Sequence, residues 1–308
     1  MREGKPAGPG HRLKDRLAAR AAENGLLRVD AEWQVLTGGR TSPVWRVRSG
    51  PEDRVCRFRV ADHRNPLFPC LPDAERRCLE AVSGCELGPP FLGSLSAEGG
   101  ELFVLEYSSG TSWTCAGSER PVADVCEVAR LLGRLHRFSP LPDLPVRPCG
   151  ETALRRQVRR ILSLCSGEDS SRLSRLEPGT APGSGTEDCG PRSLVHGDVV
   201  PGNIIRSPNG LLLIDWQCPG IGDPVDDIAC FLSPAMQMTN GGRPLGSALC
   251  DSFLEAYPCA ATVARYRSLR PLLQWRMAVY CLWRVVCGRP GYPEYRQAME
   301  AEIQAMTG

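Results

Sequence analysis

Two kinds of hydrophobic pattern divide the chain near residue 107. Before that point, apolar residues gather in short runs of the length that is typical of strands. These runs predict five strands, at Trp33–Leu36, Val44–Val47, Arg54–Val60, Phe91–Leu95 and Leu102–Tyr107. Two further segments, Leu13–Asn24 and Pro72–Ser83, have apolar residues at spacings of three and four and predict helices. We therefore expect a small, β-rich lobe at residues 1–107.

Helical spacing dominates residues 108–308. The predicted helices are Val122–Phe138, Glu151–Cys165, Ser171–Leu176, Ser247–Tyr257, Ala260–Ser268, Pro271–Cys287 and Pro293–Met306. The segment 166–193 is rich in Gly, Ser and Pro and is interpreted as a surface excursion. A chain of 308 residues is long enough for two lobes. The pattern predicts an α+β fold whose larger, mainly helical lobe covers residues 108–308.

One stretch, Leu194–Asp227, combines apolar runs with a regular series of polar residues: LVHGDVVPGNIIRSPNGLLLIDWQCPGIGDPVDD. Asp198 is followed five residues later by Asn203, and an apolar run then ends at Asp215. This layout is typical of phosphoryl transfer, where one Asp orients the attacking hydroxyl while an Asn and a second Asp hold magnesium. Carboxylate and amide oxygens are suited to that ion. We expect a phosphotransferase site here.

Composition narrows the class of protein. The formal net charge is +2, with 42% hydrophobic and 23% charged residues, which is ordinary for a globular protein and argues against nucleic acid as the main partner. The apolar segment Leu272–Cys287 is short for a membrane span and contains Arg276 and Arg284, so a membrane protein is not expected. The N-terminus lacks the apolar core of a secretory signal.

The cysteines indicate the cellular compartment in which the protein is expected. The fifteen cysteines are odd in number, scattered along the chain and never spaced as C-x-x-C. Buried thiols in a reducing cytosol explain them better than a disulfide framework or a metal centre. The expected location is cytoplasmic.

Lysine is almost absent, and this restricts how a nucleotide can be held. Lys5 and Lys14 are the two lysines of the sequence, so a later basic site must use arginine. Arg57 and Arg59 share one face of a predicted strand, where a guanidinium could grip phosphates. The alternative is a solvated strand face. Glu75, on the next predicted helix, could pair with such an arginine or could simply be an acidic residue favoured in a first helical turn.

The motifs His-Gly-Asp-x4-Asn, Ile-Asp-Trp and Gly-Asp-Pro-x-x-Asp, in this order, resemble the aminoglycoside phosphotransferase and choline kinase superfamily. The resemblance extends from about Trp33 to the final helices. It implies a two-lobed fold like that of eukaryotic protein kinases, with ATP and Mg²⁺ as cofactors and a small-molecule hydroxyl as the acceptor.

The resemblance also implies roles for residues of the second lobe. Asp198 would be the catalytic base, His196 would support its loop, and Asn203 and Asp215 would be the magnesium ligands. Asp223 would have a structural role near the metal ligands. Either Asp226 or Asp227 would anchor the catalytic loop from the following helix.

In the first lobe, the resemblance assigns nucleotide contacts. Gly38 and Gly39 would match the hairpin that covers the phosphates, although two glycines alone are also typical of an ordinary tight turn. Arg57, with Arg59 as the alternative, would be the basic clamp, and Glu75 its partner. The backbone around Glu106 and Tyr107 would be the hinge that contacts adenine.

The acceptor is the least defined part. After Leu245 there are five acidic residues and seven arginines, a balance that argues against a polycationic aminoglycoside. Trp275, Trp283 and Tyr280 could surround a quaternary ammonium group, or they could be core packing. The sequence favours a choline-like amino alcohol or related metabolite, with an antibiotic kinase as the alternative.

Two departures from the family pattern bear on activity. The clamp cannot be a lysine, and Gln217 stands where many relatives have an acidic residue. A nucleotide-binding pseudokinase without catalysis is therefore a further alternative. The sequence leaves the oligomeric state open.

Overall fold

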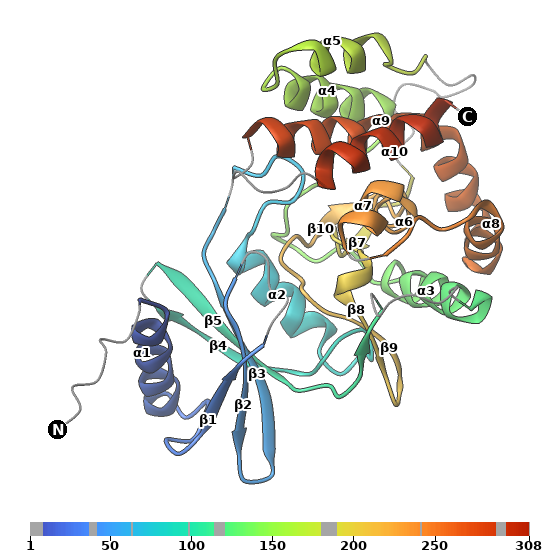
Figure 1. Ribbon diagram of the computed structural model, residues 1–308. Helices are drawn as coiled ribbons and strands as arrows, with labels where there is room; N and C mark the ends of the chain where they lie inside the picture. The colour runs from blue at the N-terminus through green and yellow to red at the C-terminus, as the bar shows by residue number, and fades with distance from the viewer. Residues whose placement is uncertain are drawn as a thin grey trace. The chain divides into compact units, whose positions relative to one another are not determined.

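The computed structural model describes residues 9–36, 42–62, 64–97, 99–113, 121–179, 190–240, 242–287 and 294–307. The chain divides into two compact units. The first contains residues 1–64 and 69–108, and the second contains residues 65–68 and 109–308. The short segment Asn65–Phe68 therefore belongs with the second unit, although it lies inside the first predicted range. Figure 1 labels the elements along the chain.

The first unit is built on a five-stranded antiparallel sheet with the order β1-β2-β3-β5-β4. Its strands are β1 (Glu32–Val35), β2 (Val44–Ser49), β3 (Glu52–Arg59), β4 (Phe91–Ala97) and β5 (Gly100–Glu106). All five predicted strands are present, with ends that differ by up to a few residues.

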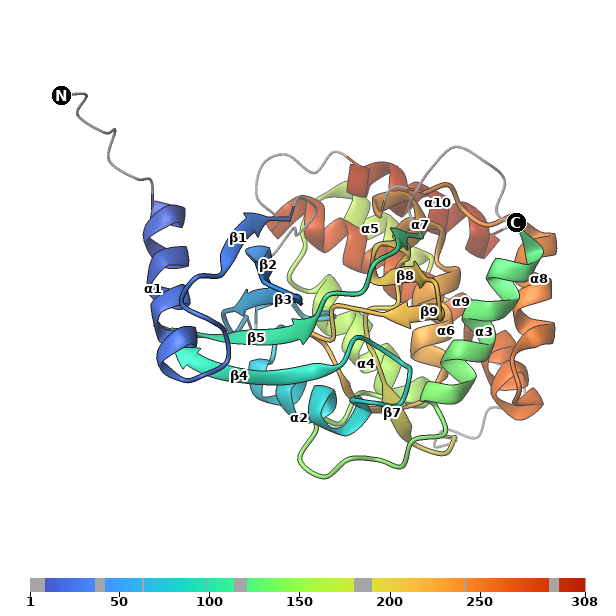
Figure 2. The ribbon, with the colours of Figure 1, turned by 90° about the horizontal axis from the view of Figure 1, so that it is seen from below.

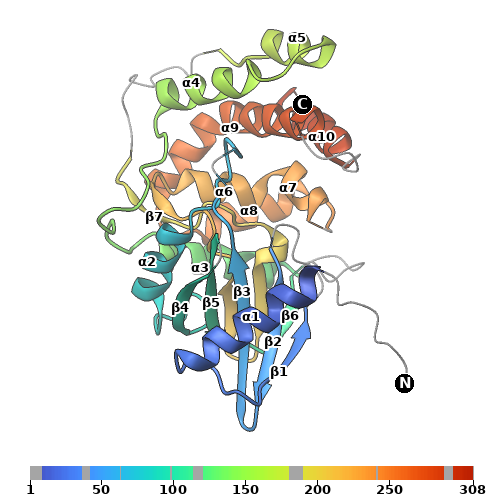
Figure 3. The same ribbon diagram turned by 90° about the vertical axis from the view of Figure 1, so that its left-hand side faces the viewer.

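Two helices accompany this sheet, α1 (Pro9–Glu23) and α2 (Pro72–Val82). Figure 3 shows α1 lying across one face, where Leu17 and Ala21 join Cys56 and Phe58 in the core. Side chains alternate between the two faces of a strand. The intervening arginines of β3 therefore point away from this core, and they meet Glu75 of α2. Lys14 lies on α1, 3.1 Å from Asp15.

The second unit contains two small antiparallel sheets and most of the helices. The strands are β6 (Thr111–Ser112), β7 (Ser193–Val195), β8 (Ile204–Ser207), β9 (Gly210–Leu213) and β10 (Gly220–Gly222). β7 pairs with β10, and β8 pairs with β6 and β9. The two- and three-residue strands β6 and β10 were not predicted, because such short runs carry no readable alternation.

The helices of the second unit pack around α9 (Ala260–Cys287), which contacts α10 (Glu294–Thr307), α4 (Glu151–Leu162) and α6 (Val225–Leu232). Figure 2 shows α3 (Val122–Leu135) beside α8 (Ser247–Ala256). The remaining helices are α5 (Glu168–Arg175), α7 (Pro234–Thr239) and the 3-10 turn η1 (Pro201–Asn203). The predicted α+β class is confirmed. Within the described ranges, no helix is both long and apolar enough to cross a membrane.

One helix prediction was wrong. Ala260–Ser268 and Pro271–Cys287 are not separate helices but parts of the single helix α9, which contains Pro271 in its interior. The proline ring is on the exposed side, while Leu269, Leu272 and Leu273 are buried. Packing of that apolar face holds the helix together across a residue that removes one backbone hydrogen bond.

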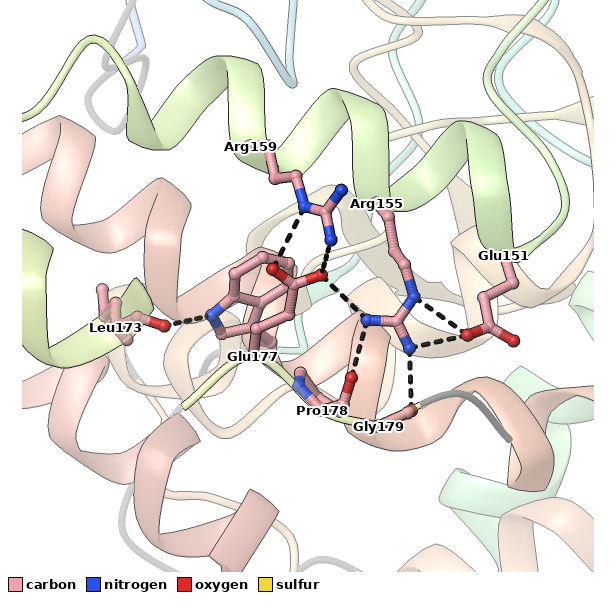
Figure 4. A network of polar contacts seen from close by, with 8 residues as sticks. Glu151, Arg155, Arg159, Leu173, Glu177, Pro178 and Gly179 are labelled. Carbon is pink, nitrogen blue, oxygen red and sulfur yellow. Dashed lines mark hydrogen bonds and ion pairs between the residues drawn. The ribbon is translucent and has the colours of Figure 1, made fainter. Parts of the chain in front are cut away.

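The segment 177–179, which precedes the catalytic stretch, is bound to α4 by a network of ion pairs and hydrogen bonds (Figure 4). Arg155 donates to Glu151, Glu177 and the carbonyl oxygens of Pro178 and Gly179. Arg159 also donates to Glu177, at 2.8 and 3.1 Å.

The indole Nε1 of Trp275 donates to the carbonyl oxygen of Leu173 on α5 at 2.8 Å. The side chain is fully buried. Trp275 therefore belongs to the core. For this residue, the interpretation as core packing is correct and the interpretation as part of an ammonium pocket is not.

Candidate active site

The loop between β7 and β8 brings Asp198 and Asn203 together. Asn203 Nδ2 donates to the backbone oxygen of Asp198 at 2.9 Å and to its carboxylate Oδ2 at 3.1 Å. Gly197, near the start of this loop, has a φ of +78°, and a Cβ there would lie 2.1 Å from the carbonyl oxygen of Cys218. Because a side chain cannot fit, glycine is required at this position.

A second amide also contacts the Asp198 carboxylate. Gln217 Nε2 donates to Oδ2 at 3.1 Å, from the segment that follows β9. Two neutral donors therefore converge on one oxygen and fix the orientation of the carboxylate. The sequence identified Gln217 only as a departure from relatives and gave no sign of this contact.

His196 is fully buried and links the loop to the end of β9. Its Nε2 lies 3.1 Å from the carbonyl oxygen of Ile214, and its Nδ1 lies 3.3 Å from the backbone nitrogen of Asp198. A carbonyl can only accept and an amide N–H can only donate, so the geometry requires the neutral tautomer protonated on Nε2. The ring packs against Trp216 with a centroid distance of 4.5 Å. This arrangement supports the loop rather than the reacting atoms.

Asp227, at the start of α6, anchors the same loop through hydrogen bonds to its backbone. Its carboxylate accepts from the backbone nitrogens of His196 and Gly197, each at 2.8 Å, and lies 3.0 Å from His136 Nε2. Burial by itself raises the pKa of this carboxyl group, but the hydrogen bond and charge of His136, with His196, outweigh it and leave the pKa below its ordinary value. Asp227 is thus the member of the Asp226–Asp227 pair that contacts the loop.

His136 and Arg147 also belong to this anchor, and sequence reasoning missed both roles. His136 Nδ1 lies 2.8 Å from the Tyr257 hydroxyl. Arg147 reaches Asp226 Oδ2 at 3.3 Å and the carbonyl oxygen of Cys218 at 3.2 Å. A lone helical histidine and an arginine in a proline-rich connection carry no spacing signal that would have identified them.

Asp223 and Asp226 are neutralised by arginines of α9. Arg265 forms a bidentate pair with Asp223 at 2.7 and 2.8 Å. Arg276 lies 2.8 Å from Asp226 Oδ1. These pairs connect the residues around the active-site loop to the longest helix of the unit.

Asp215 lies two residues after the end of β9 and has a φ of +66°, a left-handed conformation that is unusual for a non-glycine residue. Its neighbour Ile214 donates its backbone N–H to the carbonyl oxygen of Asn203 at 2.9 Å. Asn203 uses its amide nitrogen on Asp198, which leaves its side-chain oxygen as a donor atom for a cation. Two hard oxygen donors on adjoining segments fit the partial protein coordination that magnesium usually has beside phosphates.

In the first unit, Glu75 is shared by both arginines of β3. Arg57 Nη2 contacts Glu75 Oε1, and Arg59 Nε lies 3.2 Å from Oε2. Arg59 also donates to the Ser42 hydroxyl at 2.9 Å. Arg59 is fully buried, whereas Arg57 is 7% exposed. Gly38 and Gly39, the predicted phosphate-covering glycines, lie outside the described residues.

The predicted hinge, Glu106 and Tyr107, uses its backbone N–H groups within the first unit. Glu106 donates to Pro90 at 2.9 Å and Tyr107 donates to Asp53 at 3.0 Å. Arg46 lies over the Tyr107 ring at 3.6 Å. An adenine contact at these two residues would therefore have to use groups other than their N–H donors.

Aromatic residues cluster in the second unit around Tyr280. Phe68 and Tyr295 meet its ring edge to face, with centroids 4.9 and 6.4 Å away, and Trp283 stacks on it at 5.9 Å. The hydroxyl accepts from Asn65 at 3.2 Å. Burial raises the pKa of Tyr280 well above its ordinary value, and the charges of Tyr295 and Asp198 add to the rise.

Comparison with known proteins identifies the family. A profile of the phosphotransferase enzyme family matches residues 32–272. No curated protein sequence matches the chain significantly.

Solved structures show the same fold at low sequence identity. Aminoglycoside phosphotransferase APH(4)-Ia is 12% identical, with a TM-score of 0.66 over 96% of this chain and 98% of that one. A choline/ethanolamine kinase family protein from Mesorhizobium loti is 15% identical, with a TM-score of 0.62 over 96% and 93%. Spectinomycin phosphotransferase APH(9)-Ia, in complex with ADP and spectinomycin, is 12% identical, with a TM-score of 0.59 over 96% and 94%.

The profile match covers well over half of the chain, and the structural likeness extends over nearly all of it. The protein therefore belongs to the phosphotransferase enzyme family and is a small-molecule phosphotransferase with a protein-kinase-like fold.

Proposed function

We propose that the protein transfers the γ-phosphate of ATP to a hydroxyl group of a small molecule, with Asp198 as the base. The observation that carries this proposal is the Asp198 carboxylate, fixed through Oδ2 by the amides of Asn203 and Gln217. A carboxylate held in this way can orient an acceptor hydroxyl and accept its proton during transfer. The buried bonds from Asp227 to the loop keep that geometry in place.

Asn203 and Asp215 are proposed to hold magnesium, which would neutralise charge on the transferred phosphoryl group when it is bound with the nucleotide. The use of a nucleotide is supported by the family and by the ADP bound in the structure of spectinomycin phosphotransferase. Thiol-rich composition supports a cytoplasmic location, where ATP is available.

Arg57 is proposed as the nucleotide clamp. Two arginines share one carboxylate, so the cluster of Arg57, Arg59 and Glu75 carries a net charge of about +1, whereas a lysine–glutamate pair would carry none. Arg57 is the more exposed of the two arginines, and Arg59 also donates a hydrogen bond to the Ser42 hydroxyl. Arg59 would then position Glu75, while Arg57 contacts phosphate.

A choline-like amino alcohol is the preferred acceptor. The support comes from the aromatic cluster of Phe68, Tyr280, Trp283 and Tyr295, because ring faces bind quaternary ammonium groups. Arg284 already lies 5.0 Å above the Tyr295 ring, so the ammonium would use Tyr280 and Trp283 instead. The same arginine disfavours a polycationic antibiotic.

The test is a magnesium-dependent phosphotransfer assay with choline, ethanolamine, an aminoglycoside and spectinomycin as acceptors. We expect choline or ethanolamine to be preferred and Asp198→Ala to lower kcat by at least about 100-fold. Glu255→Gln, an exposed acidic residue on α8, is the matched control and should retain activity. Equal ATP consumption by wild type and Asp198→Ala with every acceptor would refute the catalytic role.

The same assay, together with thermal unfolding, distinguishes the roles of Arg57 and Arg59. It also distinguishes the alternative functions. Arg57→Ala should raise the KM for ATP more than Arg59→Ala, and Arg59→Ala should mainly lower the melting temperature. Nucleotide binding without turnover of any acceptor would support the pseudokinase alternative. Preference for the aminoglycoside or spectinomycin would support an antibiotic kinase.

A further inference from the structure

A cavity of about 180 Å³ lies among helices α6 to α10 of the second unit. Its walls combine polar groups with the apolar side chains of Leu232, Leu254, Leu273 and Met277. Asp198, Asn203 and Asp215 are not among its lining residues. The cavity adjoins the C-terminal end of α6, whereas the active-site loop is held at the N-terminal end of that helix by Asp227. It is therefore separate from the site described above.

The cavity contains a buried carboxylate, that of Glu302 on α10. Its Oε1 accepts from the Ser233 hydroxyl and from the backbone nitrogen of Ala235, at 3.1 Å for the latter. Its Oε2 is inaccessible and has no hydrogen-bonding partner among the described residues. A buried carboxylate oxygen without a partner is costly, and native proteins rarely keep one unless it has a role.

The exposed rim of the cavity carries charges of both signs, from Asp251 of α8 and Arg270 of α9. An anionic ligand would place its charge against Glu302 at the base. A purely apolar ligand would leave the Glu302 oxygen without a partner. A ligand with an N–H donor at one end and a short hydrocarbon body satisfies both the carboxylate and the apolar walls.

We propose that this cavity is a second small-molecule site, which takes a small amphipathic amine with its ammonium group against Glu302. The volume limits the size of the ligand, because an apolar cavity of about 150 Å³ accommodates benzene. A compound such as benzylamine has the required size and chemistry. The site does not depend on the phosphotransfer reaction proposed above.

The surroundings of Glu302 allow its charge to respond to a ligand. Burial raises the pKa of Glu302 to about 7, while the Ser233 hydroxyl, the Ala235 N–H and the charge of Arg270 lower it. Tyr266 of α9 and Cys250 and Asp251 of α8 also line the cavity. An incoming ammonium group would favour the ionised carboxylate, so amine binding should strengthen as the pH rises from about 6 to about 8.

The test is calorimetric titration of the full chain with benzylamine, and with toluene as a ligand of similar shape that lacks the amine. We expect benzylamine to bind at least about tenfold more tightly than toluene at pH 8. Glu302→Gln keeps an oxygen for Ser233 and Ala235 but removes the negative charge, so it should abolish this preference. Its fold can be checked by thermal unfolding.

A second variant tests the location without changing the carboxylate. Ala305 is half-buried at the edge of the cavity, and Ala305→Phe should block it and prevent binding of both compounds. Asp198→Asn, in the active-site loop, should leave benzylamine binding unchanged. The proposal is overturned if benzylamine does not bind at about 10 mM, if it binds no better than toluene, or if its binding survives Ala305→Phe.

Discussion

At the residue scale, the Asp198 carboxylate depends on a contact that the sequence did not reveal. The motif spacing predicted that Asp198 and Asn203 would lie together, because five residues on a tight loop cannot separate far. Gln217 reaches the same oxygen from the segment after β9, where Asp215 has a φ of +66°. A left-handed aspartate has no sequence signature comparable to that of glycine, so this backbone conformation could not be predicted.

Replacing Gln217 tests how far this second amide matters. Gln217→Leu keeps the approximate size and removes the donor to Asp198. We expect kcat to fall roughly tenfold, the scale of one hydrogen bond to a charged group, while the KM for ATP stays near its wild-type value. Steady-state kinetics at saturating acceptor check this. An unchanged kcat would mean that Asn203 alone orients the base.

Glu302 should also make the stability of the protein depend on pH. Its pKa in the folded protein is about 7, above the ordinary value of 4.5, so the folded state binds this proton more tightly than the unfolded state. The stability that it contributes is complete below about pH 4.5 and is lost as the pH rises through about 7. The loss corresponds to about 3 kcal/mol.

Urea unfolding of wild type and Glu302→Gln at pH 5 and pH 8 measures this effect. Because glutamine does not ionise, the variant should gain stability relative to wild type by up to about 3 kcal/mol between the two pH values. Glu300→Gln, a partly exposed residue on the same helix, should show little such gain. Parallel pH dependence of wild type and Glu302→Gln would contradict the buried, raised pKa.

At the scale of elements, the helices and strands that the sequence located are those with enough residues to show a period. The five strands of the first unit and most helices of the second were recognised in this way. α7 has six residues, of which Pro234 is the first, and it was missed, as were β6 and β10. For α9 the pattern was present throughout, and the division at Pro271 was wrong because packing of the buried face outweighs one lost hydrogen bond.

Pro271 should consequently lower the stability of the protein, and substituting it should raise the stability. Pro271→Ala restores a backbone donor in the middle of α9, and the exposed ring leaves no cavity behind. We expect the free energy of unfolding to rise by about 1 to 3 kcal/mol. Pro72→Ala is the matched control, since Pro72 lies in the first turn of α2, where proline is favourable. A loss of stability in Pro271→Ala would show that the proline serves the helix.

At the scale of the whole molecule, ion pairs between distant segments organise the second unit. Asp226 joins Arg147 to Arg276 of α9, and Asp223 joins Arg265. The sequence placed these aspartates near the catalytic stretch but could not choose their partners from thirty-five arginines, the thirty-seven basic residues less two lysines. Charge pairing over such separations follows from the fold and is not encoded by local spacing.

Breaking one of these buried pairs should destabilise the protein. Asp226→Asn removes the charge that the buried Arg276 and the partly buried Arg147 share, and the expected loss is about 3 kcal/mol or more. Asp30→Asn, which affects an exposed pair with Arg28, should leave the melting temperature unchanged. Equal melting temperatures for wild type and Asp226→Asn would show that the pair adds nothing to stability.

The scarcity of lysine has a practical consequence for chemical labelling. Both lysines precede β1, and Lys14 lies on α1 of the first unit with 24% of its side chain exposed. Arginine stays protonated and does not react with the esters that modify amines. A dye or a solid support attached through amine chemistry would therefore be confined to the N-terminal segment. The loop of Asp198 and the cavity of Glu302 would remain chemically unmodified, and all immobilised molecules would be attached through this same segment.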